Sequence, residues 1–151
     1  MTAVALRPAA ATDGEAMRAL VHSAYSPYME VMRITPAPML ADYDEIASSG
    51  CAWVAESDGH VVGLVVLRLF EDHALVENLA VSAAAQRIGI GTALLEFAEK
   101  TAAASGLDSM HLYTNEAMTE NLSYYPRRGY REVNRATEDG YRRVFFEKAL
   151  H

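Results

Sequence analysis

The sequence has a single cysteine, Cys51, among 151 residues. An intrachain disulfide is therefore excluded, and a lone cysteine is typical of proteins in a reducing compartment. Long apolar runs are also missing, since the longest, Val61–Leu67, has the length of a strand and is closed by Arg68. The residues before Pro8 lack the basic N-terminal region and the apolar region of a secretory signal peptide, so we expect no such signal. From these absences we expect a cytoplasmic protein with no membrane partner.

Positive charge is scarce. Lysine and arginine together number 13 against 20 acidic residues, which gives a formal net charge of −7. A chain this acidic is poorly suited to bind nucleic acid or an anionic membrane. The deficit lies in residues 1–75, which have four arginines against ten acidic residues, whereas residues 76–151 have nine basic and ten acidic residues. The second half is therefore nearly neutral.

The remaining composition is that of a globular protein. Hydrophobic residues make up 51% and charged residues 22% of the chain. Its length is the usual size of one domain, so we expect a single domain over residues 1–151 with a core that needs no disulfide or metal. The five histidines have no metal-ligand spacing to Cys51 or to one another, and we therefore expect no metal site.

Hydrophobic periodicity predicts four helices. The first begins at a capping box formed by Thr12 and Glu15, and its apolar stripe consists of Met17, Leu20, Val21 and Ala24. The segment between Tyr25 and Pro38 has no clear periodicity. The other predicted helices are Met39–Ala47, Thr92–Ser105, and a short one that begins at Thr119 as N-cap.

Seven strands are predicted from alternation and from turn signals such as Asp58-Gly59. The order of elements is β-α-α-β-β-β-α-β-α-β-β, which indicates a mixed sheet covered by helices. The predicted strands are Val4–Leu6, Cys51–Glu56, Val61–Phe70, His73–Val81, Met110–Thr114, a strand from the Gly129-Tyr130 turn to Asn134, and Tyr141–Lys148.

The most informative segment is the loop Gln86–Thr92, between a strand and a helix. Its two glycines allow backbone N–H groups to turn toward a ligand, and the helix adds the positive end of its dipole. Arg87 adds a side-chain charge. Such a loop suits a pyrophosphate. The Walker spacing is missing, and the dinucleotide fingerprint lacks its third glycine, because position 94 is Leu94.

This loop resembles the acyl-CoA loop of the GNAT superfamily of N-acetyltransferases, Q/R-x-x-G-x-G/A, at Gln86, Gly89 and Gly91. The downstream segment Asn121–Tyr130 is similar to the family pattern Asn-x-x-x-Tyr-x-x-x-Gly-aromatic. The resemblance covers nearly the whole chain. It implies an α/β (α+β) fold of the GNAT type, with a mixed central sheet of about six to seven strands, a splayed strand pair and about four helices.

By this resemblance the cosubstrate is acetyl-CoA, bound in a cleft between the two splayed strands. Leu79 and Val81 would bind the pantetheine arm through their backbones, and Asn121 would contact the cosubstrate from the other side. The resemblance places the pyrophosphate on the loop residues Gln86, Arg87, Ile88, Gly89, Ile90, Gly91 and Thr92.

Acetyl transfer to an amine needs a base, because an alkylamine is mostly protonated at neutral pH. Glu77 is a candidate, since on a regular strand it shares a face with Leu79 and Val81, where poor hydration would favour proton uptake. The alternative is an exposed or salt-bridged glutamate, and Tyr113 and Glu116 are further candidates. The resemblance places the general acid at Tyr125, although Pro126 should end or kink that helix.

In the family, the segment between the first two helices lines the acceptor pocket. The residues concerned are Tyr25, Tyr28 and Met29, with Met32 and Met39 as further members. Core packing or a dimer interface is the alternative role, chiefly for the methionines. Nearby acidic residues predict a cationic acceptor amine, and they are Asp42, Asp44 and Glu45.

Three functions are consistent with these patterns. The first is an N-acetyltransferase that moves the acetyl group from acetyl-CoA to a primary amine of a small molecule or peptide by direct attack. The second is a non-catalytic acyl-CoA-binding or sensor domain of the same fold. The third is a nucleotide-binding protein that uses the same loop. The resemblance also allows a homodimer.

Overall fold

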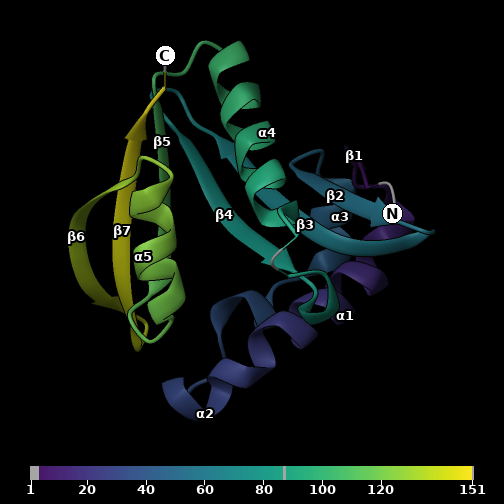
Figure 1. The fold of residues 1–151 in the computed structure, drawn as a ribbon, viewed down its shortest axis with the longest axis horizontal. Coiled ribbons are helices and arrows are strands. Elements are labelled where there is room, and N and C mark those ends of the chain that lie inside the picture. The colour runs from purple at the N-terminus through teal and green to yellow at the C-terminus, as the bar shows by residue number, and fades with distance from the viewer. Residues whose placement is uncertain (1–3, 87, 151) are drawn as a thin grey trace. The chain divides into compact units, whose positions relative to one another are not determined.

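The computed structural model describes residues 4–86 and 88–150. Within these residues seven strands form one sheet in the order β1-β2-β3-β4-β5-β7-β6 (Figure 1). The β4–β5 pair is parallel, and the β1–β2, β2–β3, β5–β7 and β6–β7 pairs are antiparallel. The expected mixed sheet is therefore confirmed. The strands are β1 (Ala5–Pro8), β2 (Ala52–Ser57), β3 (His60–Leu69), β4 (Ala74–Val81), β5 (Ser109–Asn115), β6 (Arg131–Glu138) and β7 (Tyr141–Ala149).

Helices lie at the four places predicted from the sequence. Their bounds are α1 (Gly14–Tyr25), α3 (Tyr43–Ser48), α4 (Ile90–Ala104) and α5 (Thr119–Arg127). The segment without periodicity contains the four-residue helix α2 (Met29–Met32) between 3-10 turns at Ser26–Tyr28 and Ala37–Leu40. Among the described residues, every helix is too short or too polar to cross a membrane.

The start of α1 differs from the prediction. Thr12 is exposed and lies in a 3-10 turn, Ala11–Asp13, that precedes the helix, so the Thr12–Glu15 capping box is wrong. Asp13 closes this turn instead, because its carboxylate accepts the Ala10 N–H at 2.6 Å while its own N–H donates to the Ala10 carbonyl at 2.8 Å.

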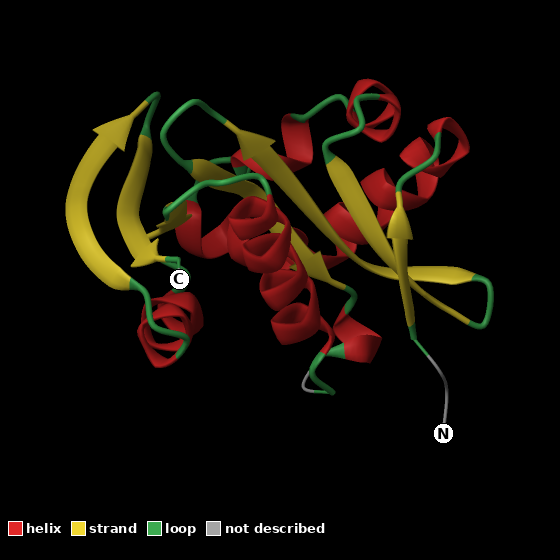
Figure 2. Cartoon of the chain, turned by 90° about the horizontal axis from the view of Figure 1, so that it is seen from above, coloured by secondary structure: helices red, strands yellow, loops and turns green. Residues whose placement is uncertain are grey.

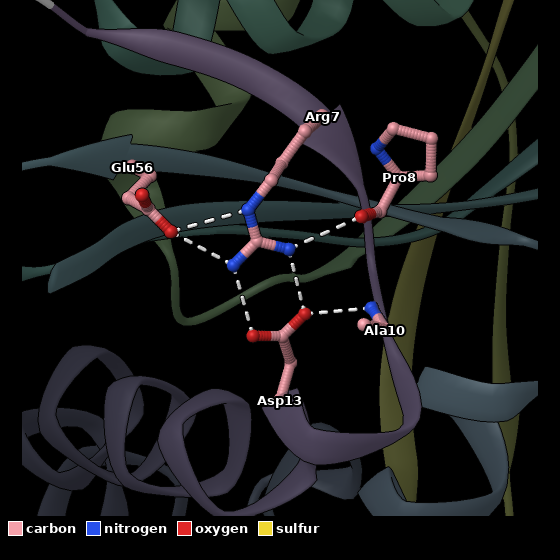
Figure 3. Close-up of polar contacts among 5 residues, drawn as sticks. All are labelled: Arg7, Pro8, Ala10, Asp13 and Glu56. Atoms are coloured by element: carbon pink, nitrogen blue, oxygen red, sulfur yellow. Dashed lines mark hydrogen bonds and ion pairs between the residues drawn. The ribbon is translucent and has the colours of Figure 1, made fainter. Parts of the chain in front are cut away.

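Arg7 on β1 fixes the same carboxylate from the other side (Figure 3). Its guanidinium donates to both oxygens of Asp13, at 2.8 and 3.0 Å, and to Glu56 of β2 at 2.8 and 3.1 Å. Local spacing could not predict this cluster, because its three charged residues come from separate elements.

The chain forms two compact units, and the first comprises residues 1–67 and 78–98. Its core lies between α1, α3 and the strands β2, β3 and β4; the apolar stripe predicted for α1 points into it at Met17, Leu20 and Val21. On β3, Gly63 allows α4 to come close, since a Cβ there would lie 2.9 Å from Leu94 and 3.0 Å from Ile90.

The second unit comprises residues 68–77 and 99–151. Within it β4 pairs with β5 only from Ala74–Met110 to Val76–Leu112, a short register that agrees with the expected splayed pair. The helix α5 covers one face of β5 and β7 (Figure 1). β6 and β7 form a long curved hairpin (Figure 2), and β6 is the last strand of the sheet, exposed along nearly its whole length and interrupted by a bulge between Glu132 and Asn134.

Candidate active site

The loop between β4 and α4 is braced by its first residue. The Gln86 side chain turns back and donates from Nε2 to the Val81 carbonyl at 3.2 Å. Gly89 has φ of +89°, a backbone conformation that favours glycine, and among the described residues other than its two chain neighbours no atom lies within 4 Å of the place that a Cβ would take. Arg87, which was expected to add a charge here, lies outside the described residues.

The helix α4 begins directly after this loop, at Ile90. The Ala93 N–H donates to the Gly89 carbonyl at 3.0 Å, which closes the first helical turn. Backbone N–H groups that precede this bond have no carbonyl partner within an α-helix and carry the positive end of the dipole. The turn passes close to β4 at Gly91, where a Cβ would lie 3.4 Å from the Val81 side chain. Ile88 is exposed and Ile90 is buried, so the loop is anchored on one side only. This geometry suits a pyrophosphate.

On β4, the two residues expected to bind pantetheine are half-buried. Leu79 lies beside α1, whose Tyr25 hydroxyl approaches its carbonyl at 3.5 Å, and Val81 is the residue that Gln86 and Gly91 contact. These contacts bring Tyr25, β4 and the loop together within the first unit.

Glu77, the candidate base, belongs to the second unit and is exposed. Its Oε2 accepts from Nε and Nη2 of Arg68, both at 3.3 Å. The geometry is that of the alternative stated above, a salt-bridged and exposed glutamate. The two-residue alternation of the strand predicted correctly that Glu77 lies on the same face as Leu79. It could not predict the ion pair, because Arg68 comes from the preceding strand.

The residues expected to line the acceptor pocket follow one another at the end of α1. Tyr25 is the last residue of α1, Tyr28 ends the next 3-10 turn, and Met29 begins α2 with an exposed side chain. Tyr25 donates its hydroxyl proton to Asn78 Oδ1 at 2.9 Å. Sequence reasoning missed Asn78. The available signal was a polar residue between Val76 and Ala80 on an otherwise apolar strand face.

Tyr125, the candidate acid, is buried on α5 against aromatic rings. Its ring centroid lies 5.3 Å from that of Tyr124, 5.8 Å from Tyr130 and 5.9 Å from Phe146. Burial raises the pKa of the Tyr125 phenol well above its usual value of 10.0. Tyr125 is only 7% exposed, and within the described residues no hydrogen bond to its hydroxyl is found.

Asn121 connects α5 to the sheet, and Tyr130, which follows α5, connects to α4. Asn121 Nδ2 donates to Thr114 Oγ1 of β5 at 3.0 Å, so this amide nitrogen is directed at the strand. The Tyr130 hydroxyl donates to Glu99 at 2.7 Å, and Lys148 Nζ lies 3.1 Å from the same carboxylate. Burial and the bond to Glu99 raise the pKa of Tyr130.

The two further base candidates are engaged in charged contacts. The Arg143 guanidinium lies 4.5 Å from the ring centre of Tyr113. Glu116 forms ion pairs with Arg135 at 3.2 Å and Arg142 at 3.9 Å. In the part of the chain that the structure describes, no three His, Cys, Asp or Glu side chains are grouped so that they could hold a metal ion.

Comparison with known proteins identifies the family to which this geometry corresponds. Residues 15–130 match the model of the Acetyltransferase (GNAT) family. A curated relative, the uncharacterized protein YxbD of Bacillus subtilis (strain 168), is 33% identical over 88 residues, which cover 58% of this chain and 52% of YxbD. The match thus spans about half the length of that relative.

Solved structures have the same fold at low sequence identity. A GCN5-related N-acetyltransferase from Rhodopseudomonas palustris has a TM-score of 0.82 at 22% identity, covering 99% of this chain and 98% of that one. The PaiA N-acetyltransferase from Thermoplasma acidophilum, solved in complex with coenzyme A, has a TM-score of 0.78 at 17% identity, with coverages of 97% and 99%. The ribosomal-protein-S18-alanine N-acetyltransferase of Escherichia coli has the same TM-score and identity, with coverages of 98% and 94%.

Proposed function

Because the chain belongs to the acetyltransferase (GNAT) family, we propose that it transfers the acetyl group of acetyl-CoA to a primary amine of a small molecule or peptide. The observation that carries this proposal is the loop Gln86–Thr92, braced on Val81 and opened by Gly89 at the first turn of α4. A structural relative solved with coenzyme A and one that acetylates a protein alanine support both halves of the reaction. We expect this activity in the cytoplasm.

CoA is a polyanion, and a chain of net charge −7 would repel it. In this proposal, oriented backbone N–H groups offset that repulsion. The first-turn N–H groups of α4 would bind the pyrophosphate, with Arg87 as a side-chain cation. The backbone of Leu79 and Val81 would bind the pantetheine arm, and Asn121 would contact it from α5. The remaining loop residues in contact would be Ile88, Ile90 and Thr92.

The reaction requires one bond to form and one to break. The amine nitrogen attacks the thioester carbonyl carbon, the C–S bond breaks, and the sulfur leaves with its electron pair. We assign Glu77 to take the proton that the ammonium must lose before attack, and Tyr125 to donate a proton to the departing sulfur. The second proton, which the nitrogen loses after attack, then restores the Tyr125 phenol. The Tyr125 phenol is protonated at neutral pH even at its usual pKa of 10.0, and burial raises that pKa further.

The direct test is acetyl-CoA turnover, followed by the release of free thiol, against a panel of amines. We expect turnover with at least one primary amine. Tight acetyl-CoA binding without turnover of any amine would favour the sensor function, and binding of ATP or NAD without binding of CoA would contradict the proposal altogether.

A pair of glycine variants tests the role of the loop. Gly89 and Gly59 both have positive φ, +89° and +78°, and in the described part of the chain no atom beyond their neighbours meets a Cβ at either, so alanine strains the backbone similarly at both. Gly59 lies in the β2–β3 turn. We expect Gly89→Ala to raise the KM for acetyl-CoA about tenfold, the loss of about 1.4 kcal/mol of binding. The Gly59→Ala control should leave that KM unchanged, and an equal rise in both variants would contradict the loop assignment.

A further inference from the structure

The chain reverses at the end of α5, and the reversal brings two tyrosine rings together. The Tyr130 N–H donates to the Tyr125 carbonyl at 3.1 Å, and the Gly129 N–H donates to the Pro126 carbonyl at 3.1 Å. These two bonds form a Schellman motif, whose left-handed residue is Gly129 with φ of +94°. The Tyr130 ring consequently lies edge to face against the Tyr125 ring, with an interplanar angle of 72°.

The hydroxyl end of Tyr130 is fixed by a charged hydrogen bond. It donates to Glu99 Oε2 of α4 at 2.7 Å. Lys148 Nζ of β7 lies 3.1 Å from Oε1 and 3.2 Å from Oε2 of the same carboxylate. The side chains of Glu99 and Lys148 are 15% and 28% exposed, so water competes weakly for these bonds. Glu99 therefore joins α4, β7 and the segment that follows α5.

Lys148 restricts the Tyr130 ring in a second way. A Cβ at Gly129 would lie 3.2 Å from Lys148 Cε and 3.6 Å from its Nζ, so the lysine side chain passes directly over this glycine. The ammonium lies 5.5 Å from the centre of the Tyr130 ring. The ring is thus held at its hydroxyl by Glu99 and contacted on one face by Lys148, which limits its freedom to turn away from Tyr125.

The phenol of Tyr125 depends on its neighbours for its direction. Within the described residues no hydrogen bond to its hydroxyl is found, and the residue is 7% exposed. Packing against the rings of Tyr124, Tyr130 and Phe146 therefore sets where the phenol points. Because the Glu99–Lys148 ion pair fixes Tyr130, it also limits the movement of the Tyr125 phenol. A group that donates a proton in the transition state needs such restriction, since small displacements lower the rate.

We propose that Glu99 is a positioning residue for the general acid and acts through Tyr130 on the Tyr125 phenol. The proposal rests on the acetyltransferase function and on the acid role of Tyr125 proposed above, and it deepens both. The proton still passes from the Tyr125 oxygen to the departing sulfur, and Glu99 exchanges no proton in the reaction. Loss of the Tyr130–Glu99 bond should therefore lower kcat and leave the binding of acetyl-CoA unchanged.

A double-mutant cycle with Tyr125 tests the proposal, since residues that act through one group have non-additive effects on kcat. Tyr130→Phe keeps the ring and removes only the bond to Glu99. We expect it to lower kcat about tenfold in the wild type but less than twofold in Tyr125→Phe, which has no phenol hydroxyl left to position. The KM for acetyl-CoA should stay within about twofold of the wild-type value. Turnover is measured with the best acceptor among spermidine, tryptamine and L-lysine amide.

Two substitutions of Glu99 separate positioning from a general loss of stability. Glu99→Ala removes the carboxylate, and it should lower kcat at least as much as Tyr130→Phe does. Glu99→Gln keeps an oxygen that can accept the Tyr130 proton, so it should retain more of kcat than Glu99→Ala. Ser109→Ala is the matched control, because it removes a hydrogen bond of the same unit, Ser109–His111 at 2.9 Å, that involves none of these rings. It should leave kcat unchanged.

The positioning role is wrong if Tyr130→Phe leaves kcat unchanged, if it lowers kcat equally in both backgrounds, or if Ser109→Ala lowers kcat as much. If Tyr125→Phe retains the wild-type kcat, the acid role fails and this inference fails with it, while the enzyme remains an acetyltransferase. If the wild type turns over no amine of the panel, the proposed function itself fails.

Discussion

Tyr125 is buried among aromatic rings, and we have proposed it as the general acid. We expect Tyr125→Phe to lower kcat by about 100-fold, the lower end of what a positioned acid contributes. Tyr124→Phe is the matched control, since adjacent helical residues face different directions. Equal losses of kcat in the two variants would show that the aromatic cluster matters and the hydroxyl does not.

The pKa of Tyr125 makes a second prediction about the same residue. Burial raises this pKa above 10.0, so the phenol stays protonated throughout the alkaline range in which enzymes are usually assayed. The wild-type kcat should therefore show no decline that depends on Tyr125 between pH 7 and about pH 10. A decline in that range that disappears in Tyr125→Phe would contradict both the protonation state and the acid role.

Asp13 links stability to pH through a single side chain. Its hydrogen bonds to Arg7 lower its pKa below the usual 3.8, so its contribution is present above about pH 4 and is lost as the pH falls through the folded-state value. We expect Asp13→Asn to lower the free energy of unfolding by about 1–3 kcal/mol at pH 7.

The same denaturation experiment at pH 2–3 should show a smaller difference between Asp13→Asn and the wild type. Asp108→Asn, at an exposed position, serves as the control and should change stability little at either pH. A difference between wild type and Asp13→Asn that is independent of pH would show that the carboxylate charge is not what stabilises this corner.

At the scale of the element, the position of α4 depends on a missing side chain on β3. A methyl group at Gly63 would collide with Leu94 and Ile90 in the first two turns of the helix. We expect Gly63→Ala to cost about 1–3 kcal/mol of stability by overpacking, and to raise the KM for acetyl-CoA by displacing the N-terminus of α4. Leu94→Val removes the Cδ1 atom nearest to the new methyl group, so it should cost less stability in Gly63→Ala than in the wild type; equal costs would show that the close packing of helix on strand is not the cause.

Elements defined by an uninterrupted local pattern could be predicted from the sequence. The stripe of Met17, Leu20 and Val21 is buried as expected, and Asp58 and Gly59 both take the positive φ of a tight hairpin turn. Pro126 was expected to end or kink α5. The helix continues through Pro126 and ends one residue later, at Arg127. A proline in the last turn is tolerated because it removes only a single backbone hydrogen bond.

The candidate site was less predictable, because its contacts join residues distant in sequence. The ion pair Arg68–Glu77 and the hydrogen bond Tyr25–Asn78 connect different elements, and no rule of sequence spacing predicts either. The segment from Tyr25 to Pro38 folds as short turns held by tertiary contacts, which local periodicity does not encode. Gly89 is the exception, since its positive φ is a local backbone property that a glycine in the sequence indicates directly.

At the scale of the whole molecule, the charge of the first half predicts which amines bind. Asp42 caps α3 and Asp44 pairs with Arg18, while Glu30 and Glu45 are exposed. We expect cationic amines to be better substrates than neutral or anionic ones. Their KM should rise severalfold between about 20 and 300 mM salt, as screening shortens the reach of these charges. A salt-independent KM, or a preference for anionic amines, would show that the acidic residues only solvate the surface.

The exposed strand β6 has a consequence for behaviour at high concentration. A sheet that ends in a long flat strand offers its free backbone groups to any other chain, which is how sheets extend into aggregates. Here that edge alternates charges at Arg131, Glu132, Arg135 and Glu138, and the bulge breaks its register. The charges and the bulge of β6 therefore oppose the addition of a further strand, and we expect them to hinder polymerisation through this edge of the sheet.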